Sequence, residues 1–135
     1  MKIITIKGNS MSTRRVIIVD DDKFYANIVS KIFVQRGWDT VVCFSMESAF
    51  QIFNPKQVGL IITDIFMPGM GGIEGIKFLR QAYPGSPIIA MSGGWDGMTS
   101  QATVEAAIKI GADAGLQKPI NVEKLDHIFS TLNLS

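Results

Sequence analysis

The chain has 135 residues, of which 47% are apolar, so it is long enough for one domain with a substantial core and too short for two. Thirteen basic and twelve acidic residues give a formal net charge of +1, which excludes a whole-protein field that attracts nucleic acid or an anionic membrane. A single cysteine, Cys43, excludes an internal disulfide, and no apolar run approaches the roughly 18 residues of a membrane span, so we expect a cytoplasmic protein.

The N-terminal segment, residues 1–13, passes from a short alternating piece into a polar, flexible composition. We expect it to be a tail that could carry one extra strand. The folded domain is expected to span residues 14–135. Its first element is the β-branched run 16–19, which is typical of a strand that is covered on both faces.

A helix is expected directly after this strand, from residue 23 to Gly37, where a glycine would stop it. Asp22 can cap the first turn of this helix. Apolar residues that recur at helical spacing define it, at Phe24, Ile28, Ile32 and Phe33.

The rest of the chain alternates in the same way between apolar strands and amphipathic helices. Further strands are expected at 39–44, 60–63, 87–91 and 115–117, and further helices at 45–54, 72–83, 99–110 and 122–132. Strands that alternate with helices predict right-handed crossovers and helices on both faces of a sheet. The fold class is therefore α/β: a flavodoxin-like (βα)5 domain with a doubly wound, parallel five-stranded sheet in the strand order 2-1-3-4-5.

Polar side chains stand where four of these five strands end. The first strand ends at Asp20 and Asp21, and the third ends at Asp64. The fourth strand is followed by Ser92, and the fifth leads to Lys118. The carboxyl ends of parallel strands meet at one edge of the sheet, where ligands bind in such folds. Taken singly, each residue could instead be a helix cap, a turn residue or a solvated surface residue, but those explanations do not account for their joint placement.

The expected crevice holds three carboxylates, from Asp20, Asp21 and Asp64, whose charges repel one another. Protonation or a bound cation relieves such repulsion, and a site of oxygen ligands with few protein donors suits Mg²⁺. A carboxylate beside such a metal can attack phosphorus and form an aspartyl phosphate. Asp64 is best placed to do so, with the Lys118 ammonium and the Ser92 hydroxyl as contacts for the phosphoryl oxygens.

From residue 14 to residue 132 the chain resembles the receiver domain of two-component response regulators. Four motifs occur in the order and spacing of that family. They are V-D-D-D at 19–22, D-I-F-M-P-G-M-G-G at 64–72, M-S-G at 91–93 and K-P at 118–119.

The resemblance implies that Asp64 accepts a phosphoryl group from a phosphohistidine on a sensor histidine kinase or a histidine phosphotransfer protein. It also implies that Asp20, Asp21 and Asp64 hold Mg²⁺ together with the backbone carbonyl of Phe66. Ser92 and Lys118 are implied as phosphoryl contacts. The resemblance further implies a cis bond before Pro119.

The sequence departs from the family pattern at the position three residues before Lys118. The family usually has an aromatic residue there that swings inward on phosphorylation, whereas this chain has Gly115. Trp95, in a glycine-flanked loop three residues after Ser92, is a candidate substitute, although it could equally pack over an exposed helix.

Two further positions in this family influence the water that hydrolyses the phosphoryl group. They hold Phe66, two residues after the acceptor, and Gly94, two residues after Ser92. Neither has a polar side chain that can orient a water molecule. We therefore expect the protein to lose the phosphoryl group slowly. The protein is separately expected to catalyse its own phosphorylation.

No further domain is expected after Ser135, so the chain is interpreted as a single-domain regulator that docks to a downstream protein or passes its phosphoryl group along a phosphorelay. Direct DNA binding is not expected, because no basic patch appears. One alternative is a receiver-like adaptor that binds partners without phosphorylation, which Gly115 makes harder to dismiss. A flavin- or nucleotide-binding protein is a weaker alternative, because no glycine-rich phosphate loop follows the first strand.

Overall fold

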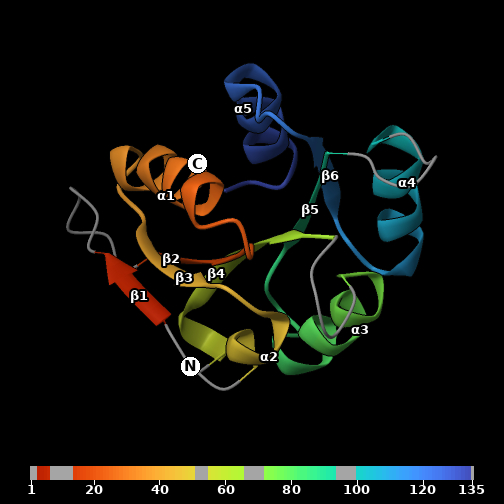
Figure 1. The fold of residues 1–135 in the computed structure, drawn as a ribbon, viewed down its shortest axis with the longest axis horizontal. Helices are drawn as coiled ribbons and strands as arrows, with labels where there is room; N and C mark the ends of the chain where they lie inside the picture. Colours follow the sequence, from red (N-terminus) through yellow and green to blue (C-terminus); the bar gives the residue numbers. More distant parts are fainter. Residues whose placement is uncertain (1–2, 7–13, 51–54, 66–71, 94–99, 135) are drawn as a thin grey trace.

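The computed structural model describes residues 3–6, 14–50, 55–65, 72–93 and 100–134 (Figure 1). Strands and helices alternate along most of this part of the chain. The strands are β1 (Ile3–Ile6), β2 (Arg15–Val19), β3 (Asp39–Cys43), β4 (Val58–Asp64), β5 (Ile88–Ser92) and β6 (Ala114–Gln117). The helices are α1 (Lys23–Gln35), α2 (Met46–Ala49), the 3-10 turn η1 (Pro55–Gln57), α3 (Gly72–Ala82), α4 (Ser100–Ile110) and α5 (Val122–Thr131).

The sheet has six strands in the order β1-β3-β2-β4-β5-β6. Its five parallel strands follow the predicted order, but the predicted strand count is wrong because β1 is added at the edge. This strand is the extra strand that the N-terminal segment was expected to be able to carry, and it pairs with β3 in antiparallel fashion, from Ile3 opposite Cys43 to Ile6 opposite Thr40. It covers the backbone edge that β3 would otherwise expose.

Helices cover both faces of the sheet, α1 and α5 on one face and α2, α3 and α4 on the other (Figure 1). Each face of the sheet has its own hydrophobic core, and alternate residues of β2 point into one or the other. Ile17 and Val19 pack toward α3 and α4. Val16 and Ile18 pack toward α1 and α5. All four are fully buried, as expected for a strand without polar positions between two layers of helices.

The helix α1 begins at the predicted residue, and the Asp22 carboxylate caps it by accepting a hydrogen bond from the Tyr25 backbone N–H at 3.1 Å. The side of α1 that meets the sheet agrees with the apolar positions read from the sequence at Phe33 and in part at Ile32, but not at Phe24 and Ile28. The buried residues are Ala26, Val29, Ser30 and Phe33. Two of these are small, which lets the helix lie close to the strands, and Phe24 is left 77% exposed.

The predicted helix 45–54 is shorter in the described residues. It spans Met46–Ala49 with Ser45 as its N-cap, and residues 51–54 lie outside the described part of the chain. Cys43 is fully buried, and burial raises the pKa of its thiol to about 12, which fits a structural role. Among the described residues, none of the helices has the length and apolar character required to cross a membrane.

Candidate functional site

The carboxyl ends of β2 and β4 lie side by side and position two acids. Val19 pairs with Thr63 across these parallel strands, so the residues that follow, Asp20 and Asp64, are neighbours at the same edge of the sheet. The Asp20 backbone N–H donates to the Cys43 carbonyl at 3.0 Å, which ties this end of β2 to β3. The topology thus brings together acids that are far apart in the sequence.

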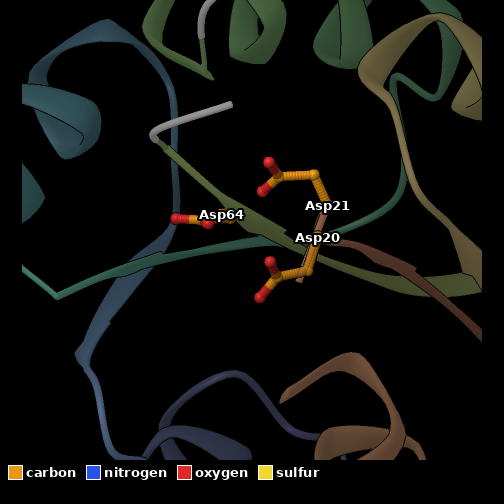
Figure 2. Close-up of side chains that lie close together, drawn as sticks. All are labelled: Asp20, Asp21 and Asp64. Carbon is orange, nitrogen blue, oxygen red and sulfur yellow. The ribbon is translucent and has the colours of Figure 1, made fainter. Parts of the chain in front are cut away.

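Asp21 joins them to form a cluster of three carboxylates. One carboxylate oxygen from each of Asp20, Asp21 and Asp64 lies within 4.8 Å of the others, and Figure 2 shows the three side chains gathered at the ends of their strands. Asp20 and Asp64 are buried, whereas Asp21 is exposed. The cluster is therefore open to solvent on the side of Asp21.

Lys118 places an ammonium group at this cluster. Its Nζ donates to Asp20 Oδ2 at 2.8 Å and to Asp64 Oδ2 at 3.1 Å, and its side chain is 18% exposed. β6 delivers Lys118 to this edge, because the Lys118 backbone N–H donates to the Ser92 carbonyl of β5 at 2.9 Å. The bond between Lys118 and Pro119 is cis.

The ionisation of the site reflects its burial. Burial raises the pKa of the Asp20 carboxyl, and this effect outweighs the opposing hydrogen bonds from Lys118 and from the Asp22 backbone. Burial of Lys118 acts to lower its pKa, but hydrogen bonds and charge from Asp20 and Asp64 outweigh that effect and raise it. The ammonium form is therefore stabilised, and Asp20 favours a bound proton or cation.

The donor set fits a hard divalent cation. Three carboxyl groups gather around the Lys118 ammonium, and carboxylate oxygens are the ligands that Mg²⁺ prefers. The partial exposure of the cluster leaves room for the water ligands that Mg²⁺ retains. Phe66, whose carbonyl was expected to complete the ligand set, lies outside the described residues.

Of the remaining predicted site residues, two lie in described strands and two lie outside the described residues. Ser92 ends β5 at the same edge of the sheet and is fully buried. Gly115 lies in β6, while Gly94 and Trp95 lie outside the described residues.

Gly115 has a close neighbour that the sequence did not indicate. A Cβ built on Gly115 would lie 1.8 Å from Cγ1 and 3.0 Å from Cβ of Val104, a residue of α4. The space beside β6 that a side chain at this position would need is therefore filled from α4.

Tyr25 was also missed as a site residue. Its ring centroid lies 4.4 Å from Lys118 Nζ, and its hydroxyl oxygen accepts a hydrogen bond from the Ile120 backbone N–H at 3.0 Å. The only sequence signal is a tyrosine in the first turn after the acids, and this does not specify its contact with a lysine from the other end of the chain.

Comparison with known proteins points to one family. The family model described as "Response regulator receiver domain" matches residues 16–130. A curated relative, a putative NtrX-like response regulator of Rickettsia bellii, is 33% identical over 120 residues. That match covers 85% of this chain and 24% of the relative, so the chain spans about a quarter of the length of the relative.

Solved structures agree with this family. A Francisella response regulator receiver domain is 28% identical with a TM-score of 0.70, and the match covers 87% of this chain and 94% of that one. The receiver domain of NtrX from Brucella abortus is 25% identical with a TM-score of 0.75, covering 89% of this chain and 99% of that one. With the matched residues spanning β2 to α5, the chain belongs to the response regulator receiver family.

Proposed function

We propose that this receiver domain accepts a phosphoryl group on Asp64 from a phosphohistidine of a sensor kinase or phosphotransfer protein, in a reaction that requires Mg²⁺. The observation that carries this proposal is the position of Asp64, which ends β4 within 4.8 Å of two further carboxylates and 3.1 Å from Lys118 Nζ. A nucleophilic carboxylate beside a cation site and a fixed ammonium is suited to phosphoryl transfer.

In the proposed step, a carboxylate oxygen of Asp64 forms a bond to phosphorus as the bond from phosphorus to the histidine nitrogen breaks. The electron pair of that bond goes to the departing imidazole, which takes up a proton. Lys118 is placed to donate to a phosphoryl oxygen, and the buried Ser92 hydroxyl is assigned a second contact. A bound Mg²⁺, held by Asp20, Asp21 and Asp64, would neutralise charge on the transferring group.

The protein that donates the phosphoryl group must dock on a surface of this domain near Asp64. Phe24 and Ile28 lie one turn apart on α1, directly after the acid cluster, and are 77% and 40% exposed. Single exposed apolar residues are common, but two at this spacing beside a reactive acid form a docking ridge that suits an apolar helical surface of the donor. The phosphorylated domain is then proposed to act by docking to a downstream protein or by phosphorelay.

The first experiment tests Asp64. Incubation with acetyl phosphate and Mg²⁺ is expected to add one phosphoryl group to the wild-type protein, because the carboxylate needs no partner protein to attack a small phosphodonor. Asp64→Asn should gain none, since an amide is not a nucleophile toward phosphorus. Intact-mass spectrometry measures both proteins.

Asp22→Asn is the matched control, because it makes the same acid-to-amide change two residues after Asp20 and asparagine also caps helices. It should be phosphorylated like the wild type. A wild-type mass that never increases, or a phosphoryl group that persists in Asp64→Asn, would contradict the assignment of Asp64. A wild-type mass that never increases would favour an adaptor that works without phosphorylation.

The docking ridge is tested by Phe24→Ala. We expect the ratio of two rates to fall about tenfold: phosphotransfer from a phosphorylated histidine phosphotransfer protein, divided by phosphorylation from acetyl phosphate. The reason is that only the protein donor needs the apolar contact. Phe78→Ala removes a 40% exposed phenylalanine from α3, on the opposite face of the sheet, and should leave this ratio unchanged. An equal fall in both variants would place docking elsewhere.

A further inference from the structure

Tyr25 faces the ammonium of Lys118 from the first turn of α1. We propose that Tyr25 is a positioning residue for phosphoryl transfer, whose ring holds Lys118 at the reaction centre through a cation–π contact. This inference rests on the proposed function, since it assigns Lys118 to the phosphoryl group. It adds a residue that none of the four sequence motifs contains.

The geometry gives Tyr25 two contacts with the same segment. Its ring centroid lies 4.4 Å from Lys118 Nζ, within the range of a cation–π interaction, and its hydroxyl oxygen accepts from the Ile120 N–H at 3.0 Å. The first contact holds the head of the lysine side chain. The second holds the backbone two residues further on, so α1 fixes both ends of this short piece of chain.

The ring differs from the other partners of Lys118 in one respect. The two carboxylates that accept from Nζ belong to Asp20 and Asp64, and Asp64 would lose its full negative charge when it becomes an acyl phosphate. The ring keeps the same electrostatic character before and after transfer. It can therefore retain the ammonium at the site while the hydrogen-bond partner of Nζ changes from a carboxylate to a phosphoryl oxygen.

A ring anchor also limits the motion of a long side chain. The lysine side chain has four rotatable bonds and loses considerable conformational entropy when it is ordered. Because the side chain of Lys118 is only 18% exposed, its contact with Tyr25 is partly shielded from water, which strengthens a cation–π interaction. Tyr25 also packs against the core beside α1, so a purely structural role must be separated from positioning.

The test compares Y25F, which keeps the ring, with Y25L, which removes it, and uses Y83F as the control. Tyr83 is the only other tyrosine, and its hydroxyl donates to the Ala49 carbonyl at 2.6 Å in the core next to α3, on the opposite face of the sheet. At saturating Mg²⁺, we expect Y25L to lower the rate of phosphorylation by acetyl phosphate about tenfold, Y25F less than about threefold, and Y83F not at all. Urea unfolding is measured on every variant, and Y25M replaces Y25L if Y25L does not fold.

A second measurement needs no phosphorylation. The tyrosine ring current should shift the Lys118 ε-methylene proton resonances upfield in the wild type and Y25F, and this shift should vanish in Y25L. A wild-type protein without the shift, or a folded Y25L that keeps the wild-type rate, would overturn the positioning role. Failure of the wild type to gain a phosphoryl group would instead contradict the proposed function, and the ring-current shift would still decide whether Tyr25 holds the lysine.

Discussion

Gly115→Ala is expected to lower the free energy of unfolding by about 2–3 kcal/mol, which is large for the addition of one methyl group. The new Cβ would lie 1.8 Å from Val104 Cγ1, far inside any normal contact distance. Gly115 is not in the left-handed backbone region, so alanine meets no conformational strain there and the cost comes from overpacking between α4 and β6. Urea unfolding of the two proteins measures the difference.

A double-mutant cycle with Val104→Ala tests the cause. That substitution removes both γ carbons, at 1.8 and 3.3 Å from the built Cβ, and leaves only Val104 Cβ at 3.0 Å. The double variant should therefore recover roughly half of the loss caused by Gly115→Ala. Gly85→Ala is the control, because a Cβ at Gly85 would meet no atom within 4 Å. If Gly115→Ala is as stable as Gly85→Ala, then α4 does not pack on β6 as described.

The same contact limits how a phosphorylation signal could be transmitted. A tyrosine or phenylalanine at position 115 could not be accommodated while Val104 stands against the β6 backbone. Position 115 thus has neither an aromatic side chain nor space for one beside β6. The helix α4, which carries Val104, contacts both β5 and β6.

Most of the fold could be predicted because its strands are uninterrupted apolar runs that end at polar residues. The run 16–19 is buried on both faces, and such a run has few alternatives to a central parallel strand. The edge strand Ile3–Ile6 gave a weaker signal, because Ile3 and Ile4 are 36% and 47% exposed and its pairing depends on the distant β3. Edge pairing is decided by tertiary contacts that a local pattern does not contain.

Helical spacing likewise identified α1 without identifying its buried face. Of the predicted positions only Phe33 is fully buried, together with Ala26 and Val29, whereas Phe24 and Ile28 face solvent. The contact between Tyr25 and Lys118 depends on that choice of face, so it could not be predicted either. The acids were predictable because strand order alone brings Asp20 and Asp64 together.

Lys118→Met is expected to lower the free energy of unfolding by about 2–4 kcal/mol at pH 7 in the absence of divalent cations. The Asp20 carboxylate is fully buried, and Lys118 Nζ lies 2.8 Å from it. Methionine keeps the volume of the side chain but leaves this carboxylate without the ammonium that offsets its burial. Urea unfolding in a chelating buffer measures the loss. Lys124→Met, at an exposed position of α5, should change stability by less than about 0.5 kcal/mol.

The loss of stability caused by Lys118→Met should become smaller at both acidic and alkaline pH. Burial raises the pKa of Asp20 above 3.8. As pH falls through the folded-state pKa, the carboxyl takes up a proton, and the Lys118 ammonium then contributes less to stability because there is no longer a buried negative charge to neutralise. The pKa of Lys118 is raised above 10.5, so its contribution is complete below 10.5 and is lost as pH rises through the folded-state pKa. The stability difference between wild type and variant should therefore be largest near neutral pH. A difference that is equally large at pH 3, or one no larger than for Lys124→Met at pH 7, would show that Lys118 does not neutralise Asp20.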